Sequence, residues 1–185
     1  MALTESKMIE LATPMPSFKL KATTGKMVDS SDLKGEAALI CFICNHCPYV
    51  KHIASQLSQL GKDLQQKNID VIAINANDTA AYPDDSFENM TREVIQRDYT
   101  FPYLFDESQT IAREFGAVCT PDFFLFGPDR KLYYRGQLDG SRPGNKVAND
   151  GNDLRQAVTE LLAGRQPPTN QIPSIGCNIK WKNPQ

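Results

Sequence analysis

Hydrophobic and polar residues follow clear periods along this chain, and these periods predict its main elements. The uncharged run 37–43 has the length of a strand and the composition of one buried on both faces. After it, apolar residues recur at steps of three and four along one helical face: Val50, Ile53, Leu57, Leu60 and Leu64. A second apolar run, 69–75, completes a strand–helix–strand unit, which predicts two parallel neighbouring strands.

The segments on either side of this unit predict smaller elements. Apolar positions alternate on both sides of a Thr-Gly turn within residues 18–28, which indicates a β-hairpin. We expect residues 1–16 before it to be an irregular lead-in. The polar insert 77–100 contains an apolar helical stripe, and Asp85 or Ser86 can cap that helix.

The C-terminal half predicts one more strand pair and a last helix. Residues 123–126 and 132–135 flank a Gly-Pro-Asp-Arg turn and are expected to pair antiparallel. Gly164 ends the final helical stripe, and the tail, 165–185, is apolar enough that we expect it to pack back on the domain. Residues 1–185 are therefore predicted to form a single α/β domain, with a central mixed β-sheet flanked by helices.

Composition narrows the class of protein. The chain has 185 residues, is 41% hydrophobic and 23% charged, and carries a net charge of −2, all of which suit a globular domain. This charge balance gives no reason to expect nucleic acid or a membrane as partner. The first residues are polar and lack an apolar signal core, and five cysteines do not make a secreted disulfide framework. We therefore expect a cytoplasmic location.

The candidate chemistry lies where the first buried strand meets the long helix. The sequence places Cys44 and Cys47 there, and we expect both on the first helical turn. Unpaired N–H groups and roughly half a positive charge at a helix N-terminus favour a thiolate. Cys44, nearer the helix end, is predicted to be the more exposed and more acidic sulfur and hence the nucleophile, with Cys47 as the resolving thiol. His46, and Asn45 beside it, are expected to tune the pair, and a protonated His46 would favour the reduced form.

Three other interpretations compete with a redox pair. The two thiols can be inert core residues. Counting Cys41 gives a Cys-x-x-Cys-x-x-Cys run that suggests iron–sulfur ligation, but no fourth cysteine follows at the required spacing. Zinc would need His46 and His52 as further ligands, and His52 is expected to point along the helix away from Cys44. The strand–motif–helix context favours redox chemistry.

Three segments together resemble a known family. They are 42–50 (Phe-Ile-Cys-Asn-His-Cys-Pro-Tyr-Val), 120–125 (Thr-Pro-Asp-Phe-Phe-Leu) and 173–177 (Pro-Ser-Ile-Gly-Cys). With the element order, they are similar to the thioredoxin-like superfamily, in its redoxin branch of alkyl hydroperoxide reductase and thiol-specific antioxidant proteins. Within that branch they resemble a peroxiredoxin-like bacterial group with a Cys-Asn-His-Cys motif. The N-terminal hairpin and the insert at 77–100 are marks of the same branch.

The resemblance implies a cis-proline at Pro121 beside the cysteine pair, with Thr120 offering its backbone to an extended substrate. An ordinary trans proline that opens a strand is the alternative. The chain also departs from the family patterns: Ile43 and Ala38 replace the Trp and the buried Asp of thioredoxins, which makes His46 the candidate substitute proton acceptor. No Pro-x-x-x-Thr-x-x-Cys peroxidase loop precedes either cysteine of the pair, which favours disulfide exchange over peroxide reduction.

We therefore predict a thiol–disulfide oxidoreductase that requires no cofactor and no metal. Its partners would be thiol or disulfide proteins, or a thioredoxin-type reductant. Two alternatives stay open: a thiol-dependent peroxidase, in which Cys44 becomes a sulfenic acid that condenses with Cys47, and a non-catalytic redox sensor. Cys119 and Cys177 are candidates for extra resolving thiols, although packing in the core is the favoured expectation for both.

Overall fold

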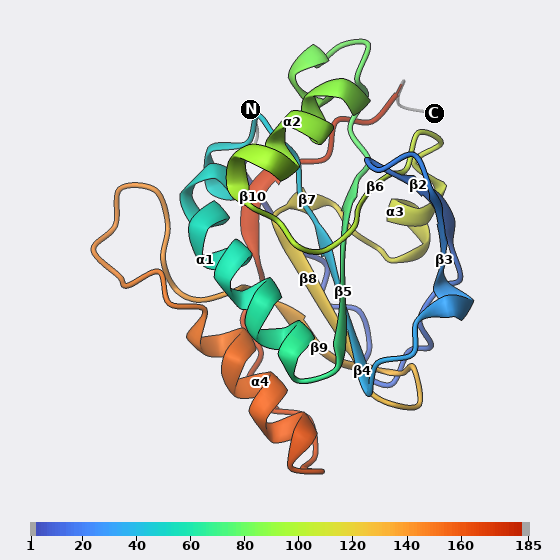
Figure 1. Ribbon diagram of the computed structural model, residues 1–185. Coiled ribbons are helices and arrows are strands. Elements are labelled where there is room, and N and C mark those ends of the chain that lie inside the picture. Colours follow the sequence, from blue (N-terminus) through green and yellow to red (C-terminus); the bar gives the residue numbers. More distant parts are fainter. Residues whose placement is uncertain (1–2, 183–185) are drawn as a thin grey trace.

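The uncharged run 37–43 forms β4 (Ala37–Phe42), the strand around which the protein is built (Figure 1). The structure, a computed structural model, describes residues 3–182. Residues 1–2 and 183–185 lie outside the described residues. They are the two ends of the predicted domain, and 183–185 is also the last part of the predicted tail. Every residue of β4 is buried, because a strand without charges is covered on both faces.

The main sheet is mixed, as predicted. Within residues 3–182 it has seven strands, in the order β3 (Met27–Asp29), β2 (Lys19–Ala22), β6 (Tyr103–Phe105), β5 (Ile69–Asn75), β4, β8 (Asp122–Phe126) and β9 (Leu132–Gly136). β4 runs parallel to β5 and antiparallel to β8. The predicted N-terminal hairpin is β2–β3, and β8–β9 is the predicted antiparallel pair.

Alternation along the strands divides the core into two halves. One half holds Leu39 and Cys41 of β4 beneath α1 (Pro48–Gln66), α2 (Phe87–Arg97) and α4 (Asn152–Leu162). The other holds Ile40 and Phe42 against α3 (Thr110–Glu114) and the residues that follow it. Figure 1 shows α1 and α4 on one side of the sheet and α3 on the other. No helix in the described part of the chain is long and apolar enough to cross a membrane.

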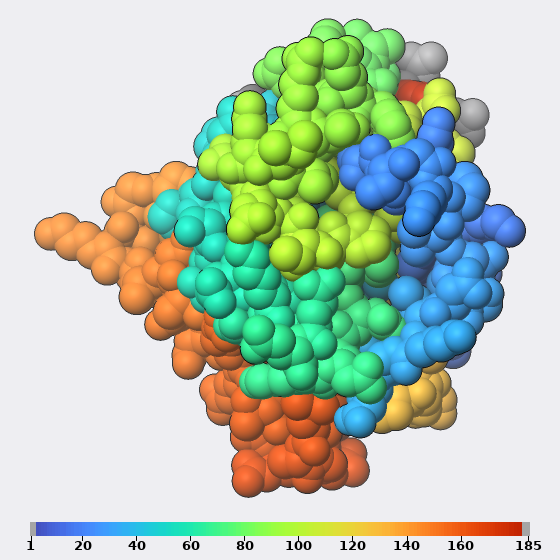
Figure 2. All heavy atoms as spheres, viewed as in Figure 1, coloured from blue at the N-terminus to red at the C-terminus, as the bar shows by residue number. Residues whose placement is uncertain are grey.

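The insert and the connection before α4 are partly exposed at the surface and partly buried. Between β5 and β6, the insert contains a short 3₁₀ helix, η2 (Pro83–Asp85), and then α2, whose N-cap is Ser86. Ser86 accepts a hydrogen bond from the backbone of Asn89, as its predicted capping role requires. The loop between β9 and α4 extends away from the body of the protein, at the left in Figure 2.

A second, smaller sheet corrects the prediction for residues 1–16. Among the described residues it has three strands, β1 (Leu3–Glu5), β10 (Ile175–Asn178) and β7 (Cys119–Thr120), all antiparallel. The lead-in is therefore not wholly irregular. β1 shows no apolar alternation because it is stabilised by backbone pairing with the C-terminal strand, which lies far away in the sequence. β10 in turn connects the tail to β7, directly before Pro121.

Gly61 marks where α1 packs most closely on its neighbour. A Cβ added there would lie 2.4 Å from the ring of the buried Phe101. We expect Gly61→Ala to lower the free energy of unfolding by about 1 kcal/mol, since overpacking costs ~1–3 kcal/mol and outweighs a gain of ~1 kcal/mol in helix propensity. Urea unfolding of this variant, with the exposed Gln66→Ala as control, measures the effect. A more stable Gly61→Ala protein would show that Phe101 gives way.

Candidate functional site

The two cysteines of the motif lie just before α1, not on its first turn as predicted. The helix begins at Pro48, and Cys47 is its N-cap with extended backbone angles. Proline suits the first helical position because the N–H it lacks would be unpaired there in any case. Cys44 therefore lies in the short loop between β4 and α1, and only Cys47 touches the helix N-terminus.

Thr120 brings the two sulfurs together from the opposite side. The Cys44 Sγ lies 3.3 Å from the Thr120 hydroxyl, and the Cys47 Sγ lies 3.2 Å from the Thr120 carbonyl oxygen, to which it donates when it carries its proton. Both sulfurs thus lie against the same residue, and each cysteine shifts the pKa of the other. The peptide bond between Thr120 and Pro121 is cis. The structure thus brings together the four residues that the sequence analysis selected from two distant segments: Cys44, Cys47, Thr120 and Pro121.

The predicted contrast between the two thiols is wrong. Cys44 is 1% exposed and Cys47 0%, so neither sulfur faces solvent. The hydrogen bond with Cys47, burial and the nearby Asp85 carboxylate all raise the pKa of the Cys44 thiol. The hydrogen bond from Cys44 lowers the pKa of Cys47 to about 5; burial opposes this shift, and the Cys177 thiol and the Val50 backbone N–H add to it. The helix N-terminus stabilises the anion on Cys47, because that residue and not Cys44 is the N-cap.

His46 is held in place by a carboxylate that the sequence analysis did not assign to the site. His46 Nδ1 lies 2.5 Å from Asp85 Oδ2, and Oδ1 of the same carboxylate accepts the backbone N–H groups of Asn45 at 2.8 Å and His46 at 3.2 Å. The Asn77 amide donates to Oδ2 at 2.7 Å. Burial by itself raises the pKa of Asp85, but the hydrogen bonds from His46 and Asn77 outweigh it, and the pKa is lowered.

Cys44 lies close to the His46–Asp85 pair. One ligand-type atom each of Cys44, His46 and Asp85 lies within 4.8 Å of the others. The imidazole stacks on Tyr82, with ring centroids 5.2 Å apart, and its buried Nε2 has no hydrogen-bond partner among residues 3–182. With Nδ1 donating to Asp85, Nε2 is the ring nitrogen that keeps its hydrogen-bonding capacity. This placement fits the predicted tuning role of His46.

Asn45 anchors the motif loop to two other elements. Its amide donates to the Asp84 carbonyl at 2.9 Å, and its side-chain oxygen accepts from the Tyr103 hydroxyl at 3.1 Å. The buried Tyr103 belongs to β6, and Asp84 belongs to η2. Asn45 therefore fixes the loop on which both sulfurs depend.

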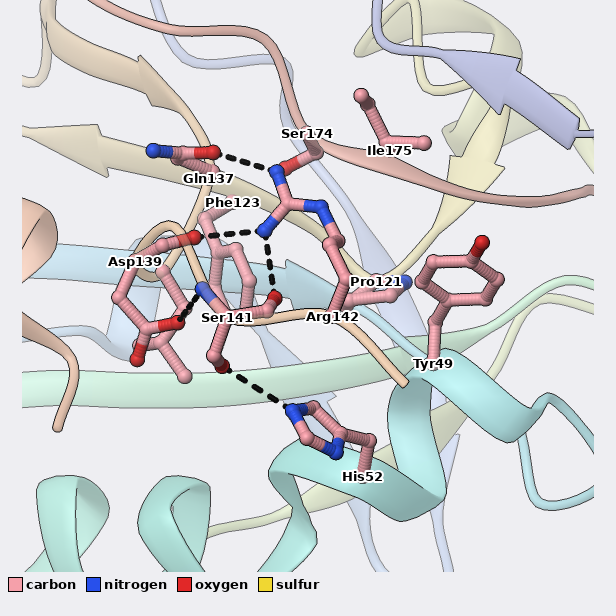
Figure 3. Close-up of a pocket in the computed structure, with 11 residues that line it drawn as sticks. Tyr49, His52, Pro121, Phe123, Gln137, Asp139, Ser141, Arg142, Ser174 and Ile175 are labelled. Carbon is pink, nitrogen blue, oxygen red and sulfur yellow. Dashed lines mark hydrogen bonds between the residues drawn. The ribbon is translucent and has the colours of Figure 1, made fainter. Parts of the chain in front are cut away.

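The metal interpretations find little support in this arrangement. The Asp85 oxygens already accept hydrogen bonds from His46, Asn77 and the backbone. His52 points elsewhere, with Nε2 3.2 Å from the Ser141 hydroxyl, as Figure 3 shows. Cys41 is fully buried within β4. A zinc ion or an iron–sulfur cluster would have to displace these contacts.

The pocket beside Pro121 is too small for a substrate. Its volume is about 20 Å³, which is space for about one water molecule. Arg142, which lines it, donates at 2.7 Å to the carbonyls of both Asp139 and Ser141 (Figure 3). Its guanidinium is therefore committed to its own loop rather than to Cys44.

Two buried acids were missed by sequence reasoning. Asp85 was considered only as a helix cap, although it follows a buried strand by ten residues in an insert next to the motif. Asp122 is fully buried directly after Pro121, its Oδ2 has no partner among the described residues, and burial raises the pKa of its carboxyl group. Its position between Pro121 and the apolar run of the predicted strand 123–126 was the available signal.

This sheet, with a Cys-x-x-Cys loop at the start of a helix opposite a cis-proline, defines a thioredoxin-like protein. A putative thiol:disulfide interchange protein from Chlorobium tepidum shares the fold, with a TM-score of 0.67 and 22% identity over 83% of this chain and 99% of that chain. Residues 11–135 match the AhpC/TSA family, and the chain belongs to that family. The predicted fold and redoxin class are confirmed.

Two further proteins are similar to this chain. The crystal structure of an uncharacterized conserved protein from Geobacillus kaustophilus is 46% identical, with a TM-score of 0.97, and the match covers 100% of this chain and 99% of that one. The thiol-disulfide oxidoreductase ResA of Bacillus subtilis is 22% identical over 63% of this chain. That match spans 62% of the length of ResA.

Proposed function

We propose that this protein is a thiol–disulfide oxidoreductase whose redox pair is Cys44 and Cys47. The observation that carries the proposal is the contact of both sulfurs with Thr120, at the N-terminus of α1. Similarity to ResA and membership of the AhpC/TSA family support it. The partners we propose are thiol or disulfide proteins, and the odd number of cysteines supports a reducing, cytoplasmic setting.

Cys44 is proposed as the attacking sulfur even though Cys47 carries the anion at rest. Cys47 lies between Cys44 and Cys177, whereas Cys44 adjoins His46 and the Thr120 hydroxyl. A thiol of raised pKa gives a stronger nucleophile once its proton is removed. The Cys47 thiolate, already hydrogen-bonded to Cys44, is the nearest base for that proton.

The exchange then proceeds in two balanced steps. The Cys44 sulfur, having passed its proton to Cys47, attacks one sulfur of the substrate disulfide, and the other substrate sulfur leaves with the electron pair of the broken bond. Cys47 gives this leaving sulfur the proton and attacks Cys44, which releases the second substrate sulfur as a thiolate that takes a proton from water. The products are a Cys44–Cys47 disulfide and two substrate thiols. Because both sulfurs are buried, we infer that local opening precedes the first step.

A peroxidase is the second candidate, and the Thr120 hydroxyl on Cys44 is the observation that favours it. In that reaction a peroxide oxygen is transferred to the Cys44 thiolate, an alcohol or water leaves, and Cys47 condenses with the sulfenic acid and releases water. The guanidinium of Arg142 is hydrogen-bonded to carbonyls of its own loop and does not activate a peroxide at the Cys44 sulfur. We therefore expect peroxide reduction to be slow.

One pair of assays separates these candidates. The protein with dithiothreitol is expected to reduce insulin disulfides, and the Cys44→Ser/Cys47→Ser variant is expected to add nothing to dithiothreitol alone. The same preparations are then assayed for consumption of hydrogen peroxide. Faster turnover of peroxide than of insulin would make the protein a peroxidase, and a Cys44–Cys47 disulfide without turnover of either would make it a redox sensor.

A further inference from the structure

The C-terminal strand brings a third cysteine to the redox pair. β10 pairs antiparallel with β7, and in this register Cys177 is directly opposite Thr120. Thr120 is also the residue that contacts the sulfurs of Cys44 and Cys47. One short backbone segment therefore holds three cysteines around it, although Cys177 is 130 residues after Cys47 in the sequence.

The strand pairing places Cys177 beside Cys47. Cys177 is opposite Thr120, the Cys47 Sγ lies 3.2 Å from the Thr120 carbonyl oxygen, and both cysteines belong to the same buried cluster. The proximity of Cys177 lowers the pKa of Cys47. Burial, together with the hydrogen bond to Cys47, raises the pKa of Cys177 to about 12, so that Cys177 is the proton donor of this contact. Cys47 thus has a thiol neighbour on each side: Cys44 on one and Cys177 on the other.

The close approach of β10 to β7 depends on Gly176, the residue before Cys177. A Cβ at Gly176 would lie 2.0 Å from the Thr120 carbonyl oxygen, so that only glycine allows this strand to pair at this distance. On its other edge β10 is held by β1, with Leu3 opposite Cys177. The third cysteine is therefore positioned by strand pairing on both sides and not by the chance folding of a free tail.

Cys119 is adjacent to Thr120 in the sequence, but it does not lie against Cys47 as Cys177 does. It is the residue before Thr120, but its thiol donates to the Pro121 carbonyl at 3.8 Å. Because neighbouring residues of a strand point to opposite faces, Cys119 and Thr120 direct their side chains away from each other. Cys119 is thus a buried cysteine of the same small sheet that can serve as a matched control for Cys177.

We propose that Cys177 is a third redox thiol, which attacks the Cys47 sulfur of the Cys44–Cys47 disulfide and forms a Cys47–Cys177 disulfide. The electron pair of the broken bond goes to the Cys44 sulfur, and the proton of Cys177 ends on Cys44. One S–S bond forms and one breaks, so no further oxidant is needed. The step rests on the proposed function, and it gives the oxidised protein a free Cys44 thiol beside His46.

Disulfide mapping of the full-length protein tests this exchange. Tryptic cleavage places Cys44 and Cys47 on one peptide, 35–51, and Cys177 on another, 166–180. The reduced protein is oxidised briefly with diamide, freed of reagent, and incubated before acid quenching, alkylation and mass spectrometry. We expect the internal disulfide of 35–51 to decline while the cross-linked pair of peptides appears at the same rate, with a constant number of free thiols.

Variants assign the sulfurs and provide the control. Oxidised Cys44→Ser is expected to form the cross-link in nearly full yield, Cys44→Ser/Cys47→Ser none, and Cys119→Ala the same as the unmodified protein. An internal Cys44–Cys47 disulfide that persists, with no cross-link in either the unmodified protein or Cys44→Ser, would overturn the role of Cys177 and leave the proposed function intact. Failure to form either disulfide would instead count against the proposed function itself.

Discussion

Cys47→Ser is expected to leave the protein covalently attached to its substrate through Cys44. When reduced Cys47→Ser is incubated with glutathione disulfide, Cys44 attacks and no sulfur is available to release the adduct, so intact-mass measurement should show stoichiometric glutathione. Serine suits an N-cap, which keeps α1 intact. Turnover of protein disulfides should fall about a thousandfold or more in both single variants, because loss of a nucleophile has effects of that order or larger.

The matched variants decide which sulfur attacks. Cys44→Ser, whose new hydroxyl can still bond Thr120, is expected to take up no glutathione, because the proposed attacking sulfur is absent. Cys41→Ala, which removes a sulfur buried in β4, should turn over like the unmodified protein. A stable glutathione adduct on Cys44→Ser but not on Cys47→Ser would reverse the roles proposed for the two cysteines.

Asp85→Asn is expected to lower the free energy of unfolding at pH 7 by about 3 kcal/mol, since removing one partner of a buried charged network has effects of this order. The asparagine NH₂ would face N–H donors that the carboxylate now accepts. Because the folded-state pKa of Asp85 is lowered, its contribution is complete above the unfolded pKa and disappears as the pH falls through the folded value. The difference between the two proteins should therefore narrow below about pH 4.

Urea unfolding at pH 7 and at pH 3 measures this difference. Asp84→Asn is the control, because the neighbouring Asp84 is exposed and its substitution should change stability by less than about 0.5 kcal/mol. Equal stability of Asp85→Asn and the unmodified protein at pH 7, or a loss that is independent of pH, would show that the ionised Asp85 carboxylate does not stabilise the folded protein in this way.

The local pattern of the sequence was enough for most elements and for the position of the motif. Apolar runs without charge predict buried strands, and a stripe of period 3.6 predicts α1, because these signals depend only on neighbouring residues. The hairpin β2–β3, the capping of α2 by Ser86 and the antiparallel pair β8–β9 follow in the same way. The first residue of α1 was not predicted correctly, although a proline such as Pro48 favours the first position of a helix.

The acidity of the two sulfurs could not be read from the motif. The helix N-terminus acts on Cys47 because Cys47 is the N-cap, and the Asp85 carboxylate near Cys44 opposes ionisation there. Asp85 reaches the motif from an insert 38 residues beyond Cys47. A pKa depends on every charge and donor within a few ångströms, and most of these come from other segments.

The sequence by itself determined the elements, the redoxin class and the pair Cys44–Cys47 as the candidate chemistry. Only the tertiary structure decided that β1, β10 and β7 form a second sheet, that Asp85 binds His46, and that Cys177 reaches Cys47. The physical reason is the range of the interactions. Periodicity and capping act within a few residues, whereas strand pairing and buried hydrogen bonds join segments whose separation in the chain carries no local signal.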